Sequence, residues 1–181
     1  MNSEHKQLIK RYSSNKRIKT ELVSLIEGRI VDFVETDGRL NLYMTRGIYT
    51  FDTIIITRMN NNKMCVEFLG DGIIRHVHFT ISHLYPFEPP YIRVNQHSYI
   101  SLLQFNRKHN TLLGFGPNKC LCCESLTCSN NWGPICNLDI LIKEVYRNME
   151  YKRALTYQIC VDVIKYKYLN PDIPIMEFLL H

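Results

Sequence analysis

The stretch YPFEPP at residues 85–90 contains three prolines in six positions. Proline has no backbone N–H and fixes its own φ, so this stretch can form neither a central strand nor the interior of a helix. We therefore predict a rigid loop at residues 85–90. The loop separates a part of the chain rich in β-branched and aromatic residues from a part that ends in helical patterns.

The residues before the loop predict a helix followed by an antiparallel meander. Apolar side chains recur at helical spacing within residues 14–27, with Ser14 or Asn15 as the candidate N-cap and Gly28 as the stop signal. A meander of about four strands is then predicted from short β-rich segments between turn signals. The turn signals lie at residues 36–38, 46–47, 60–62 and 70–72. The best strand patterns cover residues 49–57, 63–69, 73–81 and 91–94, and the second and third of these are close enough for a hairpin.

Residues 95–119 lack a sustained period and predict a long connection. After it, helical patterns cover residues 138–149, with Asn137 as the cap, and residues 151–168. The second pattern has an apolar face made of Leu155, Ile159, Val163 and Ile164. Residues 171–180 are compatible with a short terminal helix, because proline is tolerated in a first turn. The sequence thus predicts an α+β domain over residues 16–181, preceded by an N-terminal extension at residues 1–15.

Composition restricts the class of protein. The chain has 181 residues, of which 45% are hydrophobic and 22% charged, as expected of one globular domain. The net charge of +5 is modest, and basic residues on a helix usually form a solvated face, so we expect no nucleic-acid binding. No apolar run approaches the roughly 18 residues of a membrane span, and residues 1–10 lack a secretory signal, so we expect a cytoplasmic protein and no membrane partner.

Seven cysteines without a secretory signal predict reduced thiols rather than a disulfide scaffold. Cys65 and Cys160 are expected to be small buried hydrophobes. The other five lie within seventeen residues of one another: Cys120, Cys122, Cys123, Cys128 and Cys136. This clustering favours either a reactive thiol or a metal site.

The order of these elements resembles the ubiquitin-conjugating enzyme family. The YPFEPP stretch matches the family's Tyr-Pro-Phe-x-Pro-Pro loop without a gap. KRIKTEL at residues 16–22 is similar to the family's first helix, and Trp132-Gly133-Pro134 is similar to its Trp-Ser-Pro element. The resemblance covers roughly residues 16–149 and implies the family's fold of an N-terminal helix, a meander, an active-site loop and C-terminal helices. The inserted loop and the cysteine cluster resemble divergent members encoded by large DNA viruses.

The resemblance implies an enzyme that accepts ubiquitin or a ubiquitin-like protein from an activating enzyme as a cysteine thioester. It would then transfer this modifier to a lysine or to a ligase, with no cofactor or metal. Family members with a longer active-site loop have the cysteine ten positions before the tryptophan and a leucine four positions after the cysteine. Cys122, with Leu126 and Trp132, fits both spacings and is the expected nucleophile, while Cys120 and Cys123 stay open as alternatives. A thiolate suits the reaction because it both attacks and leaves readily.

Two further sets of residues follow from the resemblance. Lys16, Arg17, Phe87 and Pro134 occupy the positions where family members contact activating enzymes and ligases. The family's His-Pro-Asn segment, whose asparagine steadies an oxyanion, is absent, and the nearest substitutes are Asn110 and Asn118. This departure bears on transfer to an amine more than on thioester formation.

Two other functions stay open at this stage. A non-catalytic variant would keep the fold as a binding module for ubiquitin or a partner, and the missing His-Pro-Asn segment favours it. A zinc-binding interaction domain would use the cluster from Cys120 to Cys136, with His109 in reserve, although its spacing departs from that of typical zinc sites.

Overall fold

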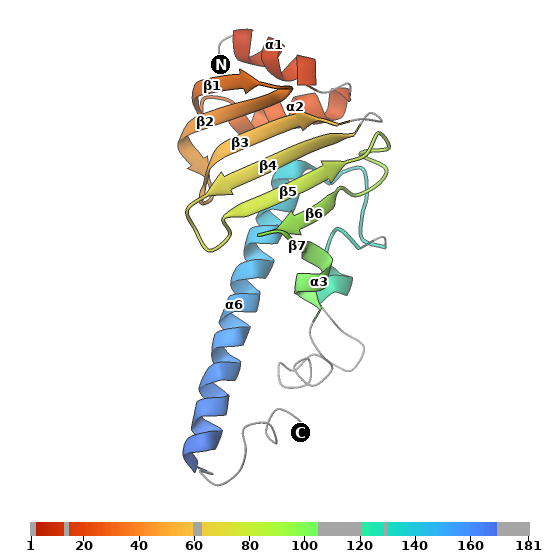
Figure 1. Cartoon of the computed structure of the whole chain (residues 1–181). Coiled ribbons are helices and arrows are strands. Elements are labelled where there is room, and N and C mark those ends of the chain that lie inside the picture. The colour runs from red at the N-terminus through yellow and green to blue at the C-terminus, as the bar shows by residue number, and fades with distance from the viewer. Residues whose placement is uncertain (1–2, 13–14, 60–62, 105–120, 129, 170–181) are drawn as a thin grey trace.

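The described residues form an α+β fold around a seven-stranded antiparallel sheet with the strand order β1 to β7 (Figure 1). The computed structural model describes residues 3–12, 15–59, 63–104, 121–128 and 130–169. The strands are β1 Ile30–Thr36, β2 Arg39–Ile48, β3 Phe51–Arg58, β4 Met64–Gly70, β5 His76–Ile81, β6 Tyr91–Val94 and β7 His97–Ser98. The helices are α1 Ser3–Tyr12, α2 Lys16–Ile26, α3 Tyr99–Leu103, α5 Leu121–Glu124 and α6 Leu138–Leu169.

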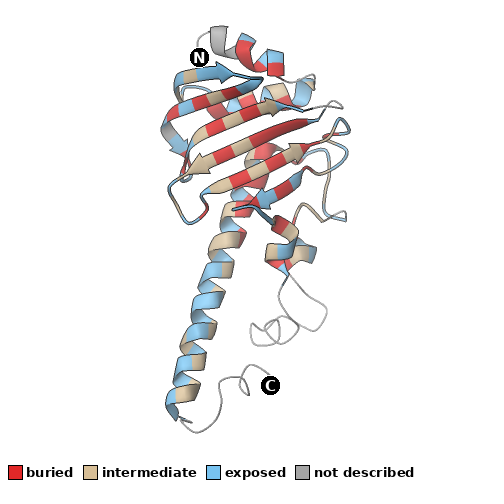
Figure 2. Cartoon of the chain, viewed as in Figure 1, coloured by how far each residue is buried: buried red, intermediate tan, exposed pale blue. Residues whose placement is uncertain are grey.

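One face of the sheet carries the core. Because side chains alternate along a strand, every second residue of the central strands points to this face. There they pack with α2 and the first half of α6, which passes behind the sheet in Figure 1. The fully buried strand residues include Leu40, Leu42, Ile54, Ile56, Val66, Phe68, Val77 and Phe79. Burial by residue in Figure 2 follows the same alternation.

The first predicted helix is confirmed as α2. Asn15 is the N-cap, and its Oδ1 accepts hydrogen bonds from the backbone N–H groups of Arg17 at 2.9 Å and Ile18 at 3.3 Å. Gly28 follows the helix with a φ of +73°, which favours glycine. Upstream, residues 3–12 of the expected extension form α1, whose Leu8, Ile9 and Tyr12 join the core.

The predicted meander is confirmed as antiparallel, but the expected number of about four strands is too small. The hairpin of β4 and β5 and the strand β6 lie where the sequence places them. The signal at residues 46–47 was wrong as a turn, because Gly47 lies inside β2 and the chain reverses at Tyr49 and Thr50. A Cβ at Gly47 would lie 2.4 Å from the carbonyl oxygen of Phe51, so glycine is there for close backbone approach rather than for a turn.

The C-terminal helical patterns are one helix rather than two. α6 runs without interruption for 32 residues, and Asn137 caps it through a 2.9 Å hydrogen bond from the backbone N–H of Ile140 to Oδ1. Among the described residues of α6, those after Asn148 are only partly buried or exposed, including the expected apolar face, and Cys160 is exposed. This half of the helix extends away from the sheet (Figure 2). The pattern at residues 171–180 lies outside the described residues.

The loop at residues 85–90 has neither strand nor helix, as its prolines predict. The connection after β6 is more structured than expected, because β7 and α3 occupy residues 97–103 of it. Its remainder, residues 105–120, lies outside the described part. Within the described part of the chain, no helix combines the length and the apolar character that crossing a membrane requires.

We expect Gly47→Ala to lower the free energy of unfolding by about 2–4 kcal/mol, because the new Cβ would clash with the backbone of Phe51. Gly133→Ala is the matched control, since a Cβ there meets no atom within 4 Å, and its effect should stay within about 0.5 kcal/mol. Urea unfolding of the two variants measures both. Equal stability of the two would contradict the close approach of β2 and β3.

Candidate active site around Cys122

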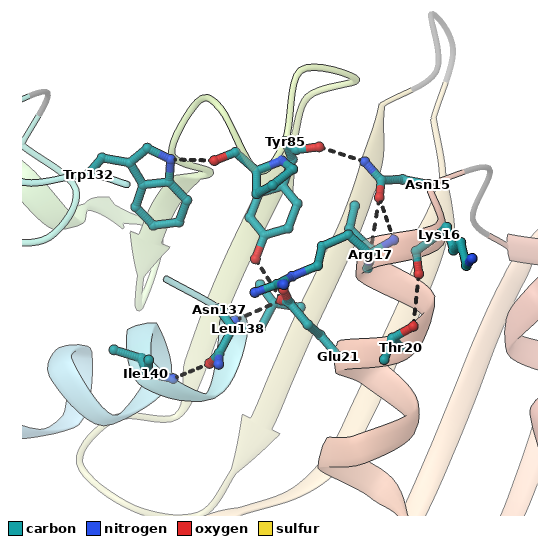
Figure 3. A network of polar contacts seen from close by, with 12 residues as sticks. Asn15, Lys16, Arg17, Thr20, Glu21, Tyr85, Trp132, Asn137, Leu138 and Ile140 are labelled. Atoms are coloured by element: carbon teal, nitrogen blue, oxygen red, sulfur yellow. Dashed lines mark hydrogen bonds and ion pairs between the residues drawn. The ribbon is translucent and has the colours of Figure 1, made fainter. Parts of the chain in front are cut away.

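The loop at residues 85–90 is held in place by two hydrogen bonds of Tyr85, one from its side chain and one to its backbone (Figure 3). Its phenol is buried and donates a 2.6 Å hydrogen bond to Oε2 of Glu21, while its carbonyl oxygen accepts one of 2.7 Å from the side-chain amide of Asn15. Burial, and then the Glu21 carboxylate, raise the pKa of Tyr85 well above its ordinary value. The loop is therefore fixed to the beginning of α2.

Glu21 joins three parts of the chain. Besides Tyr85, its carboxylate accepts a 3.0 Å hydrogen bond from the backbone N–H of Leu138, the first residue of α6, and pairs with Arg17 one turn earlier in α2. The hydrogen bond with Glu21 raises the pKa of Arg17. A carboxylate at a helix N-terminus is also favoured by the helix dipole. One buried carboxylate thus holds α2, the proline loop and α6 together.

Trp132 connects the proline loop to the segment that follows the cysteines. Its indole Nε1–H donates a 2.9 Å hydrogen bond to the carbonyl oxygen of Pro86, and its ring centroid lies 6.0 Å from that of Tyr85. Its own backbone N–H donates to the carbonyl oxygen of Cys128 at 3.2 Å. Two of the three motifs that carry the family resemblance are therefore in direct contact.

A second buried carboxylate, Glu144 of α6, fixes the chain just after the candidate nucleophile. It accepts hydrogen bonds from the Ser125 hydroxyl at 2.6 Å and from the Leu126 backbone N–H at 2.8 Å. The Tyr99 hydroxyl also donates to it at 3.0 Å, and the side-chain amide of Asn148 donates to that hydroxyl at 2.8 Å. Burial and the Glu144 charge raise the pKa of Tyr99 well above its ordinary value.

Cys122 lies in the short helix α5, half-buried and packed against the core. Its neighbour Cys123 is exposed, Cys128 is half-buried and Cys136 is buried. The structure thus gives the cysteines different surroundings, with Cys122 between the exposed and buried extremes. Cys120, together with the candidate substitutes Asn110 and Asn118, lies outside the described residues.

Asn131 is an asparagine of this site that the sequence analysis did not identify. Its side-chain amide donates to the carbonyl oxygens of Cys123 at 2.6 Å and Ser125 at 3.0 Å. It therefore orders the backbone next to Cys122.

The sequence analysis also did not identify Glu21 and Glu144, although their spacing from buried residues of α2 and α6 indicates that both lie on a buried helix face. Glu21 lies three residues after Ile18 and four before Leu25 on the apolar face of α2, and Glu144 lies three residues after Leu141 and four before Asn148 on that of α6. A carboxylate on a buried helix face requires partners.

The residues expected to bind partners are all on the surface. Phe87 is 77% exposed, Pro134 and Lys16 are exposed, and Arg17 is exposed while it pairs with Glu21. The sequence analysis missed Ile135, which is 85% exposed. The hydrogen bond between Trp132 and Pro86 joins the segments that carry Phe87 and Pro134.

The cysteine cluster shows no metal geometry within the described part of the chain. There, Cys122, Cys123, Cys128 and Cys136 do not bring three ligand atoms within bonding range of one ion. The zinc hypothesis for this cluster now depends on Cys120 and His109, which are outside the described residues.

We expect Tyr85→Phe to lower the free energy of unfolding by about 1–2 kcal/mol at neutral pH, because the Glu21 carboxylate loses one buried donor. Tyr91→Phe is the control, since Tyr91 is exposed. Urea unfolding at neutral pH compares the two, and equal effects would contradict the Tyr85–Glu21 hydrogen bond.

The same pair predicts a pH dependence. Because the folded state raises the pKa of Tyr85, the unfolded chain loses the phenolic proton first when the pH rises above about 10. The Tyr85 contribution is therefore complete below this pH and declines above it. Over this range, the free energy of unfolding of Tyr85→Phe should decline less steeply with pH than that of the wild type. Parallel curves of unfolding free energy against pH for the two proteins would contradict the raised pKa.

Comparisons with known proteins identify no relative of this chain. No family model matches it, and neither curated proteins nor solved structures give a match. The functional argument therefore depends on the residues themselves.

Proposed function

We propose that this protein is a divergent ubiquitin-conjugating enzyme, with Cys122 as the residue that carries the modifier. The observation that supports this best is the hydrogen bond from Trp132 to Pro86. It joins the Trp-x-Pro and Tyr-Pro-Phe-x-Pro-Pro motifs, which are 46 residues apart in sequence, next to the segment of Cys122. The α+β architecture with an antiparallel meander and an N-terminal helix agrees with the proposal.

The chemistry assigned to Cys122 is the exchange of one thioester for another. The Cys122 thiolate attacks the carbonyl carbon that joins the modifier to the activating enzyme, a new S–C bond forms, and the activating enzyme's thiolate leaves. The proton from Cys122 passes to solvent or to the departing thiolate. A lysine amine or a ligase thiol then attacks the same carbon, and Cys122 leaves as the thiolate.

The Glu144 carboxylate and the Asn131 side-chain amide would hold the backbone around Cys122 rigid during this step. Glu144 holds Ser125 and Leu126, which follow Cys122 by three and four positions, and Asn131 holds the carbonyl oxygen of Cys123. A nucleophile whose neighbours are fixed loses less entropy on reaching the attacking geometry. Cys122 is only half-buried, so part of it stays open to solvent and to a partner.

A partner surface is proposed for the exposed residues beside this site. Phe87 and Ile135 are large apolar side chains that are mostly in solvent, and Lys16 adds positive charge. Exposed apolar side chains rimmed by charge are typical of protein interfaces. We assign this surface to the activating enzyme and to ligases.

We expect the protein to form an adduct with ubiquitin when incubated with an activating enzyme and ATP. The adduct should be removed by a reducing agent, because a thioester exchanges with thiols. Cys122→Ser should abolish it or convert it to an ester that resists reduction. Denaturing gels run with and without the reducing agent measure both results.

Cys160→Ser is the matched control for the thioester assay, because Cys160 is an exposed cysteine on the far half of α6, and this variant should load normally. Loss of the adduct only with Cys120→Ser or Cys123→Ser would move the nucleophile to that position. Absence of any adduct with several activating enzymes would contradict the proposal and favour a binding module.

Phe87→Ala should slow discharge of the loaded enzyme by a ligase by about tenfold, as removal of an exposed aromatic anchor does in other interfaces. The unfolding free energy should stay unchanged, because Phe87 is 77% exposed. Ile73→Ala, at an apolar residue 55% exposed in the turn between β4 and β5, is the control. Equal discharge rates for the two variants would argue against a partner role for Phe87.

A further inference from the structure

A second group of reactive side chains lies on the opposite face of the sheet from the core. Cys65 and Glu67 alternate with core residues on β4, and His76 and His78 do so on the neighbouring strand β5. Glu67 pairs directly with His78 in the antiparallel register, so these side chains rise from adjacent points of the sheet. None of them belongs to the proposed active site.

Three of these side chains converge on one point. Sγ of Cys65 lies 3.7 Å from Nδ1 of His78 and 3.4 Å from its Nε2, and Oε1 of Glu67 lies 3.4 Å from Nδ1. All three ligand atoms lie within 4.8 Å of one another. Tetrahedral zinc, with bonds of about 2.3 Å to sulfur and about 2.0–2.2 Å to nitrogen and oxygen, requires edges of about 3.6 Å between S and N and about 3.4 Å between N and O. The two separations that involve Nδ1, 3.7 Å to sulfur and 3.4 Å to oxygen, agree with these edges.

We propose that Cys65, Glu67 and His78 bind one Zn²⁺ ion on the outer face of the sheet, with water as the fourth ligand. The donor set suits this ion, since zinc takes thiolate, imidazole and carboxylate ligands. The negative charges of the Cys65 thiolate and the Glu67 carboxylate balance the two positive charges of the ion, and His78 ligates as a neutral imidazole. Glu67 and His78 are each about one-fifth exposed, at 20% and 22%, which leaves solvent access for a bound water.

The neighbouring side chains hold the ligands in suitable orientations. Nε2 of His78 lies 3.0 Å from the Thr80 hydroxyl, while Nδ1 is the ring nitrogen that faces Glu67, so Nδ1 is the proposed ligand atom. Nε2 of His76 lies 3.0 Å from Oε1 of Glu67. Such contacts from outside the ligand set fix ring orientation at zinc sites. Arg93, paired with His78 in the register, donates through Nε and Nη2 to the carbonyl oxygen of Gln96.

The pKa shifts of the two ligands affect metal binding in opposite directions. Burial lowers the pKa of His78, which keeps its imidazole neutral and able to ligate. Burial raises the pKa of Cys65 to about 12, so the thiol is protonated at neutral pH and releases one proton to solvent when the ion binds.

The test is a zinc titration of the full chain after treatment with a chelator, followed by competition with a chromophoric chelator and by thermal unfolding. We expect one zinc to bind and to raise the unfolding temperature, because it binds the folded chain. His78→Gln should weaken binding by at least about 100-fold, and Thr80→Val by about tenfold. His97→Gln, an exposed histidine on β7, should bind as the wild type does.

Two further results separate this site from the cysteine cluster at residues 120–136. Cobalt bound in place of zinc should show a thiolate charge-transfer band that is lost in Cys65→Ser and kept in Cys128→Ser. If Cys65→Ser does not fold, the partly exposed His78 provides the deciding variant, with folding checked by circular dichroism. Failure to bind zinc at micromolar concentration, or binding that survives His78→Gln and disappears with Cys128→Ser, would overturn the proposal.

Discussion

The buried carboxylate of Glu21 is the constraint on which the end of the molecule with the proposed active site depends. It accepts hydrogen bonds from the Tyr85 hydroxyl and the Leu138 backbone, and it pairs with Arg17. A buried charge without partners is strongly unfavourable, so the three partners must assemble together. This requirement fixes the proline loop and the start of α6 relative to α2, and α6 in turn carries Glu144. The segment of Cys122 is thus positioned by two carboxylates acting in series.

Local patterns predicted local structure well. The cap at Asn15, the stop at Gly28 and the prolines of residues 85–90 each restrict only their immediate backbone, and the structure agrees with all three. The predicted strands lack β1, β2 and β7. β1 is an edge strand whose exposed Val31 and Val34 lack an alternating apolar face, whereas the buried Leu40, Leu42 and Met44 of β2 do alternate and were overlooked. Edge strands pack little, and so their sequence pattern is weak.

The remaining differences came from interactions between distant residues. Gly47 gave a turn signal, but its role depends on the backbone of Phe51 across β2 and β3, which no local window contains. The pattern after Met149 suggested a buried helix face, yet this half of α6 extends beyond the sheet. In the site, the motifs containing Tyr85 and Trp132 were recognised from sequence, whereas the carboxylates that position them were not. Sequence spacing identifies a buried helix face but does not identify which donors will reach it.

The two faces of the sheet impose different chemistry on cysteine. Cys122, the proposed nucleophile, packs against the edge of the apolar core, where Glu144 holds the backbone that follows it. Cys65 lies on the opposite face, where burial and Glu67 favour the protonated thiol and where His78 is close enough to share an ion. A thiol with a raised pKa is a poor nucleophile, but a metal ion that displaces its proton reverses that preference. In the two proposed roles, one cysteine serves transfer chemistry and the other coordination, and the sheet separates their surroundings.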